Sequence, residues 1–193
     1  MLELSRTPVL EPTPLFLGGG VEVHALPAHV MLRVQIARPA LLNQRAVFYA
    51  AAAAAGLPLE PGTTAREEPR AWWLAPNGWL ITANKLAATS IAEELHRALA
   101  PLAHSVVDVS DAYLTLELRG QHARNLLARG TGVELRPPQF VPERCVRTRC
   151  GHAPVLLRPL AGSEVDVELI VDRSLARQFC DWLADAAVGI EAV

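Results

Sequence analysis

The feature that most constrains the fold of this chain is a strand–helix pattern that occurs twice along its 193 residues. Residues 30–38 alternate apolar and polar side chains with the period of a half-buried strand, and the alternation returns from Tyr113. The offset from Val30 to Tyr113 is 83 residues, and the offset between predicted helix starts at Ser90 and Ser174 is 84. Because the two offsets agree, the sequence predicts an α+β fold with a duplicated strand–helix–strand–strand–helix unit.

Local signals mark the elements of the first copy. Pro39 and Gly56 enclose a helix predicted over residues 40–55, whose six consecutive alanines permit close packing against a sheet or another chain. Asn77-Gly78 between apolar runs predicts a hairpin. Ser90-Ile91-Ala92-Glu93 has the form of a capping box, so we expect the next helix to begin at Ser90.

The second copy shows the same order of signals. After the strand from Tyr113, a short helix is predicted over residues 121–129, with Gly130 able to stop it. Strands are predicted over residues 148–157 and 165–171, followed by a helix from Ser174. We therefore expect an N-terminal arm at residues 1–28, a first repeat at 29–104 and a second at 105–193. The repeats interlock in one globular unit, with edge strands that can pair between them.

Composition limits the classes of function. The net charge of −2 gives no general attraction to nucleic acid or to a membrane surface. The longest apolar run, residues 46–57, is too short to span a bilayer, and no secretory signal is visible. None of the three cysteines lies in a CxxC motif, which fits a reduced, cytoplasmic setting. A mean hydropathy of +0.20 indicates either a large core or an exposed apolar patch that meets a partner.

Three arginines are candidates for contacts with a partner or an anion. Arg144, Arg147 and Arg149 cluster around Thr148, and strand alternation would place Arg147 and Arg149 on one face. Paired guanidinium groups can bind a carboxylate in bidentate fashion. An interface salt bridge is favoured over a vestigial site for the carboxylate tail of a folate. Ser110 and Asp111 are predicted to cap a turn before Tyr113, and Asp108 could pair with Arg147 or Arg149.

The hairpin tryptophans form the second candidate group. Trp72, Trp73 and Trp79 are close in sequence, and Trp73 and Trp79 could face each other across the turn. Tryptophan is enriched at interface anchors and is also an ordinary core residue. We expect one of the three in the core and one, Trp72 or Trp79, at a partner contact.

Other constellations give no support for catalysis or metal binding by this chain. Cys145 and Cys150 lack further ligands at zinc spacing and are predicted to be packing residues, as is Cys180. The six histidines are scattered without a paired nucleophile, and the glycines at 18–20 lack the spacing of a dinucleotide-binding loop. We therefore predict no catalytic, cofactor-binding or metal-binding residues.

Several segments resemble one family when they are taken in order. Residues 106–111 read VVDVSD and lead into LELRG at 116–120, similar to a run found in the sarcosine oxidase gamma subunit family. Residues 73–80 resemble that family's WLGPDEWLL, with Ala75, Asn77 and Gly78 in place of its Gly, Asp and Glu. The likeness covers roughly residues 30–187.

The resemblance implies both a fold and a function. The family is similar in fold to the folate-binding domain of the glycine-cleavage T-protein, which agrees with the duplicated unit. It implies a non-catalytic gamma subunit that assembles or stabilises a heterotetrameric flavoenzyme with alpha, beta and delta subunits. That enzyme would demethylate sarcosine to glycine, pass the one-carbon unit to tetrahydrofolate and form hydrogen peroxide. Flavin, NAD and tetrahydrofolate are expected on the partner subunits and none on this chain.

Two alternatives stay open. The duplicated fold permits a free-standing module that binds a folate or another one-carbon carrier, although residues 129–134 lack the "KGC.GQE"-like segment of the iron–sulfur-assembly relatives. An independent enzyme is the other alternative. Whether the isolated chain forms a homodimer also stays open.

Overall fold

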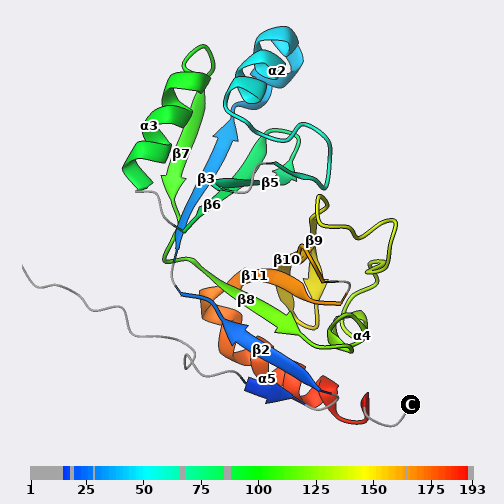
Figure 1. The fold of residues 1–193 in the computed structure, drawn as a ribbon. Helices are drawn as coiled ribbons and strands as arrows, with labels where there is room; N and C mark the ends of the chain where they lie inside the picture. The colour runs from blue at the N-terminus through cyan, green and yellow to red at the C-terminus, as the bar shows by residue number, and fades with distance from the viewer. Residues whose placement is uncertain are drawn as a thin grey trace, which may run out of the picture. The chain divides into compact units, whose positions relative to one another are not determined.

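The computed structural model describes residues 15–17, 20–27, 29–65, 68–84, 88–163 and 165–190. These residues form two compact units, drawn in Figure 1. Of the described residues, unit 1 contains those within 1–27, 112–137 and 148–193, and unit 2 those within 28–111 and 138–147. Each unit has one antiparallel sheet with helices, which confirms the predicted α+β class.

Unit 2 is built on a five-stranded sheet of order β4-β5-β6-β3-β7. Figure 1 shows α2 and α3 on the same side of this sheet. Leu32, Val34 and Ile36 of β3 are buried in the core with residues of both helices, which confirms the predicted alternation. The elements are β3 (Val30–Ile36), α1 (Arg38–Asn43), α2 (Arg45–Ala54), β4 (Thr64–Ala65), β5 (Arg70–Ala75), β6 (Gly78–Ala83), α3 (Ala88–Leu99) and β7 (His104–Asp108).

The helix predicted over residues 40–55 is two helices. Gln44, with φ −130° and ψ 40°, separates α1 from α2. Its N–H donates to Ala40 O and ends α1, while its own carbonyl accepts the N–H of Phe48 in α2. Pro39 lies in the first turn of α1, as the sequence predicted. Gly56, at φ +67°, follows α2 in a left-handed conformation that suits glycine.

The predicted hairpin is present, but its turn lies one residue earlier than expected. Trp73 on β5 is paired with Trp79 on β6, which confirms that these two residues face each other across the turn. Pro76 and Asn77 form the turn, whereas Gly78 already belongs to β6. The buried Asn77 side chain donates from Nδ2 to Ile36 O at 2.6 Å, which ties the turn to the end of β3.

The start of α3 differs from the capping-box prediction. The helix begins at Ala88, so Ser90 lies inside it and is not its N-cap residue. The prediction was wrong because the helix extends two residues beyond the local motif. Its buried side consists of Ile91, Leu95 and Leu99.

Unit 1 is built on a six-stranded sheet of order β1-β2-β8-β11-β10-β9. The strand predicted over residues 148–157 is two strands, because Gly151 at φ +55° turns the chain between β9 and β10. No helix within the described ranges is long and apolar enough to cross a membrane. The elements are β1 (Leu15–Leu17), β2 (Val21–Ala25), β8 (Tyr113–Arg119), α4 (Ala123–Ala128), β9 (Val146–Cys150), β10 (Ala153–Pro159), β11 (Val167–Asp172), the 3-10 turn η1 (Arg173–Leu175) and α5 (Ala176–Ala187).

Each sheet contains a strand that comes directly before a strand of the other sheet in the chain, and we refer to this as the exchange of β2 and β7. β2, which precedes β3 in the chain, pairs with β8 of unit 1, and β7, which precedes β8, pairs with β3 of unit 2. The registers correspond: Arg119 on β8 is opposite Glu22, and Ile36 on β3 is opposite His104. Each of these two strands therefore pairs with a strand that lies far from it in the sequence or in the other predicted repeat.

Because of this exchange, the boundaries of the two units differ from those of the predicted arm at residues 1–28 and the predicted repeats at 29–104 and 105–193. The described part of the predicted arm supplies β1 and β2, because Val21 and Val23 bury their side chains. β7 stays with the first copy, so the division falls at residues 111 and 112. Residues 138–147 return to unit 2, where Arg144 forms an antiparallel bridge with Thr63.

Candidate subunit interface

The three candidate arginines lie in two different settings. Arg144 is half-buried and forms an ion pair with Glu60 at 2.8 Å, while its Nη1 donates to Pro61 O at 3.3 Å. Arg147 and Arg149 are exposed at alternate positions of β9, on one face as the sequence predicted. Arg149 also donates to His152 O at 3.2 Å. Arg147 and Arg149 therefore remain predicted contacts, whereas Arg144 mainly holds the loop at residues 60–63.

Asp108 lies at the end of β7, next to a turn that is hydrogen-bonded to β3. Its Oδ1 accepts the Ser110 N–H at 2.9 Å and the Ser110 hydroxyl at 2.5 Å. The Ser110 Oγ in turn accepts the Met31 N–H at 2.9 Å. The turn that the sequence predicted at Ser110 is present, with Asp108 as its acceptor.

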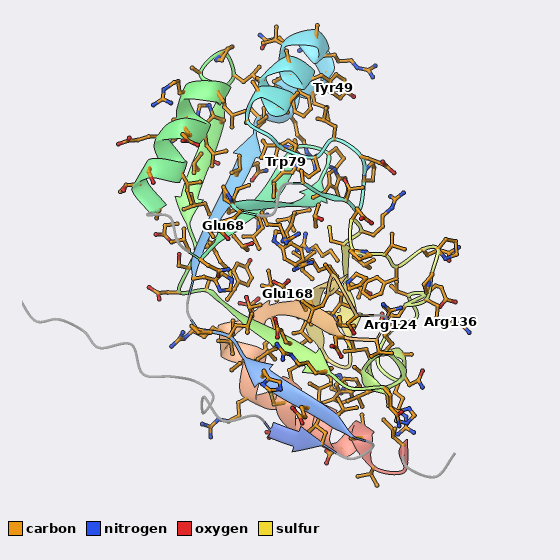
Figure 2. All side chains as sticks on the ribbon, in the orientation of Figure 1. Tyr49, Glu68, Trp79, Arg124, Arg136 and Glu168 are labelled. Atoms are coloured by element: carbon orange, nitrogen blue, oxygen red, sulfur yellow. The ribbon has the colours of Figure 1, made fainter. Side chains whose placement is uncertain are left out.

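Trp72 and Trp79, which we expected at a partner contact, are instead fully buried. Trp79 lies in the core of unit 2, where its indole N–H donates to Pro58 O at 2.7 Å (Figure 2). The indole N–H of Trp72 donates to Thr82 Oγ1 at 3.0 Å. Since the polar atom of each ring is satisfied within unit 2, both are core residues, and Trp73 is the partly exposed member of the group.

The three cysteines are buried and none of them is in a disulfide, which agrees with their predicted role as packing residues. Burial raises the pKa of the Cys150 thiol to about 12. Burial and the neighbouring Asp181 carboxylate raise the pKa of Cys180 to about 11. Cys145 Sγ lies 3.3 Å from Thr63 O. Neutral, enclosed thiols of this kind serve as packing groups and are poor nucleophiles.

Two histidines from neighbouring elements, His96 and His104, lie side by side in unit 2. Nδ1 of His96 on α3 lies 2.8 Å from Nε2 of His104 on β7, and Nδ1 of His104 lies 2.8 Å from Leu102 O. Spacing along the chain gives no signal for this pair, because the contact depends on how α3 packs beside β7. Among the described residues, no three His, Cys, Asp or Glu side chains are grouped to hold a metal ion.

A buried ion pair in unit 1 was also missed by the sequence reasoning. Arg158 on β10 contacts Glu168 on β11, and both side chains are buried. Close by, Glu117 on β8 accepts from Arg119 at 2.5 Å, and this hydrogen bond raises the pKa of the Arg119 guanidinium. A single charged residue within each of two apolar runs, 153–159 and 167–171, was the available signal.

The outer surface of α1 and α2 is mainly apolar, although Asn43 and Gln44 are exposed where the two helices meet, and we refer to its apolar part as the α1–α2 face. It starts beside Arg38 and Arg45, both exposed, and no acidic residue occurs between Arg38 and Leu59. Tyr49, 40% exposed, projects from α2 (Figure 2). The exposed residues of the face are Leu42, Ala46, Val47, Tyr49, Ala50, Ala53 and Ala54.

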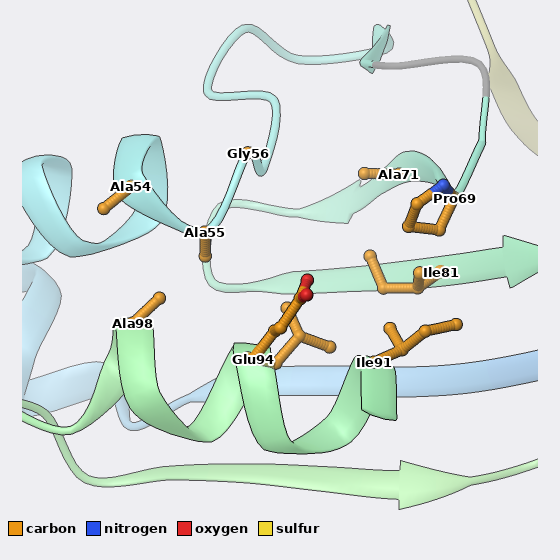
Figure 3. A pocket seen from close by; sticks show the side chains of 10 residues that line it. Ala54, Ala55, Gly56, Pro69, Ala71, Ile81, Ile91, Glu94 and Ala98 are labelled. Carbon is orange, nitrogen blue, oxygen red and sulfur yellow. The ribbon is translucent and has the colours of Figure 1, made fainter. Parts of the chain in front are cut away.

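A small pocket of about 70 Å³ opens where α2 ends beside α3, and we refer to it as the α2–α3 pocket (Figure 3). The short side chains of Ala54, Ala55 and Ala98 leave the gap, and the exposed Glu94 side chain extends beside it. Cofactor sites usually measure some hundreds of Å³. The pocket is therefore of the size for the end of one aliphatic side chain, and it adjoins the α1–α2 face at Ala54. It is lined by Ala54, Ala55, Gly56, Pro69, Ala71, Ile81, Ile91, Glu94, Leu95 and Ala98.

Comparison with solved structures identifies relatives of this fold. The chain superposes on a chain of the heterotetrameric sarcosine oxidase from Corynebacterium sp. U-96 with a TM-score of 0.75 and 24% identity, covering 92% of this chain and 89% of that one. It also matches the glycine cleavage system aminomethyltransferase T of Bartonella henselae with a TM-score of 0.55 and 15% identity, over 83% of this chain and 44% of that one. These similarities confirm the predicted fold, including its likeness to the T-protein.

Comparison of sequences identifies the family. The sarcosine oxidase subunit gamma of Corynebacterium sp. (strain U-96) is 29% identical over 139 residues, or 71% of this chain and 66% of that protein. Its counterpart from Arthrobacter sp. is 34% identical over 110 residues, or 56% of this chain and 53% of that protein, so each match spans less than two thirds of the relative. The model of the sarcosine oxidase, gamma subunit family matches residues 35–189, which include every helix from α1 to α5. The chain therefore belongs to the sarcosine oxidase gamma subunit family.

Proposed function

We propose that this chain is the gamma subunit of a heterotetrameric sarcosine oxidase-like flavoenzyme, in which it assembles or stabilises the complex without taking part in the chemistry. The observation that carries the proposal is the family match over residues 35–189. Further support comes from the uncharged α1–α2 face, since a large exposed apolar surface on a globular protein commonly marks a partner contact.

The proposed partners are alpha, beta and delta subunits, which would carry flavin, NAD and tetrahydrofolate. The complex would oxidise sarcosine to glycine, form hydrogen peroxide and transfer the one-carbon unit to tetrahydrofolate. The contribution of this chain would be its surface. Its three thiols are buried, the pKa values of Cys150 and Cys180 are raised, and Arg158 and Glu168 form a buried pair with each other.

Purification of the tagged chain from its own organism tests the proposal. We expect a yellow complex that contains three further subunits and produces peroxide when sarcosine is added. A strain that lacks this chain should yield less of the assembled complex, with unchanged flavin chemistry in whatever complex remains. Recovery of a colourless chain without partners would contradict the proposal.

Calorimetry distinguishes the gamma-subunit function from that of a free-standing folate-binding module. Calorimetry of the isolated chain with tetrahydrofolate should give no saturable heat at micromolar concentration if the folate belongs to a partner subunit. Saturable binding by the isolated chain would favour the module instead.

A further inference from the structure

The solvent side of α2 differs from that of the other long helices. α3 exposes Glu93, Glu94 and Arg97, and α5 exposes Arg177, Asp181 and Asp185. Surface helices ordinarily keep such charged residues on the side opposite the core. After Arg45, α2 exposes only alanine, Val47 and Tyr49, so its outer side resembles a surface that is covered in the working protein. The exposed residues of α5, which takes no part in this surface, are therefore suitable sites for control variants.

Tyr49 is held in place at the middle of this surface. Its ring meets Phe48 edge-to-face, with centroids 5.4 Å apart and planes at 87°. The guanidinium carbon of Arg45 lies 6.0 Å from the centroid of the Tyr49 ring. Phe48 is itself buried against the tilted ring of Trp79, so the tyrosine stands on a rigid base. An aromatic side chain ordered before binding loses little conformational entropy when a partner covers it.

The charged groups at the two ends of this surface have opposite signs. Arg38 and Arg45 lie at the start of the α1–α2 face, and the Glu94 carboxylate lies beside the pocket at the end of α2 (Figure 3). A complementary partner would therefore carry carboxylates at one end of its contact and a basic group at the other. The apolar centre between them would supply most of the binding energy.

We propose that the α1–α2 face and the α2–α3 pocket together form the docking surface for one partner subunit of the heterotetramer. The partner presents an apolar patch to Tyr49, carboxylates to Arg38 and Arg45, and one aliphatic side chain to the pocket, with a basic group beside Glu94. This assignment rests on the proposed function, and it adds the place of contact and the chemistry of the partner's surface.

A matched pair of substitutions tests the face. Ala50 on α2 and Ala184 on α5 are both exposed alanines within helices, and arginine is tolerated at exposed helical positions. In the co-expressed complex, Ala50→Arg should weaken retention of the partner subunits by about tenfold or more, as expected when a charge enters an apolar contact. Ala184→Arg should leave retention unchanged. Both variants of the isolated chain should melt at the wild-type temperature.

Two further variants test the pocket and the charges. Ala98→Leu adds carbon atoms at the pocket wall, so it should weaken retention, whereas Ala184→Leu should not. Arg45→Glu should slow association with the partner and should do so most at low salt, because long-range attraction between exposed charges is screened by ions. Unchanged salt dependence in Arg45→Glu would contradict the assigned direction of the contact.

The outcomes separate the two proposals. If wild-type chain recovers no flavin-containing complex, the proposed function fails. If wild type recovers the complex and Ala50→Arg retains it as well as Ala184→Arg does, the gamma-subunit function stands and this docking surface is overturned. If wild-type chain alone sediments as a dimer that Ala50→Arg converts to a monomer, the surface is a contact between two copies and the assignment to another subunit is overturned.

Discussion

Arg158 and Glu168 lie directly opposite each other on β10 and β11, and the guanidinium contacts the carboxylate although both side chains are buried. On the next strand, Glu117 is the register partner of Glu168. Two carboxylates are therefore neighbours across the sheet, and each has its own arginine, Arg158 or Arg119. Such an arrangement depends on both members of each ion pair.

Removal of one member of the buried pair should cost far more than removal of both. Arg158→Met leaves the Glu168 carboxylate buried without its cation, and we expect a loss of about 3–5 kcal/mol in the free energy of unfolding. The double variant Arg158→Met with Glu168→Leu should recover most of that loss. Urea unfolding, monitored by circular dichroism, measures the free energy of unfolding of the single and the double variant. A single variant as stable as the wild type would show that the pair is open to water in solution.

Gly130 should tolerate no side chain. A Cβ at this position would lie 2.3 Å from Cη2 of Trp182 and 2.6 Å from the backbone N of Gly151. Gly130→Ala should therefore destabilise the chain by about 1–3 kcal/mol, seen as a lower melting temperature and altered fluorescence of Trp182. Gly132→Ala is the matched control, since a Cβ there meets no atom within 4 Å. Equal melting temperatures for the two variants would contradict this packing.

The native thiols should react slowly. Burial raises the pKa of Cys150 to about 12 and is the main cause that raises the pKa of Cys180 to about 11. Thiolate is the reactive form, so at pH 8 a disulfide reagent such as DTNB should label native chain much more slowly than free cysteine. All three thiols should react at once in denaturant. Immediate labelling of native chain at pH 8 would show that the cysteines are accessible.

The same raised pKa predicts a loss of stability in alkali. The unfolded Cys150 thiol ionises near the ordinary cysteine pKa of 9.0, whereas burial raises the pKa of the folded thiol to about 12. The contribution of Cys150 is thus fully present below pH 9 and is lost as the pH rises from 9 towards 12. Urea midpoints of wild type and Cys150→Ala, compared at pH 8 and pH 10, measure it. The midpoint should fall less in the variant, and an equal fall would contradict the prediction.

The turn at Ser110 should matter for the pairing of β3 with β7. The Ser110 hydroxyl accepts the Met31 N–H and donates to Asp108, so Ser110→Ala leaves a part-buried backbone donor without this acceptor. We expect a loss of about 1–3 kcal/mol and faster hydrogen exchange at the Met31 amide. Ser105→Ala, at an exposed position of β7, should have little effect. Slow exchange at Met31 in the Ser110 variant would contradict the role of the hydroxyl.

Local periodicity predicted the central strands well. β3 begins at Val30 and β8 at Tyr113, the two residues from which the repeat was inferred. Alternation of apolar side chains is a property of neighbouring residues, so it can be read without knowledge of the fold. β2 was missed because its partner, β8, is distant in the sequence and because a glycine run and Pro27 flank a strand of only five residues.

The candidate interface was predicted only in part. The alanine run was expected to permit packing against a sheet or another chain, and it does place Ala51 and Ala52 in the core with Ala50 and Ala53 outside. The tryptophans were placed less well, since sequence cannot show that Pro58 O and Thr82 Oγ1 accept their indole N–H groups. The pocket depends on the spacing between α2 and α3, which no local motif determines.

The exchange of β2 and β7 between the two sheets has a consequence for biosynthesis. β2 is made before β3 to β7, whereas its neighbour β8 is made after them. The edge of β2 that pairs with β8 therefore stays unpaired until β8 has been made. Unit 2 in turn needs residues 138–147, which follow the start of unit 1. Unit 2 can therefore close only after residue 147 has been made, and unit 1 only later still, and exposed strand edges in nascent chains favour aggregation. A chain with this connectivity should benefit from chaperones, or from synthesis close to the subunits that it will join.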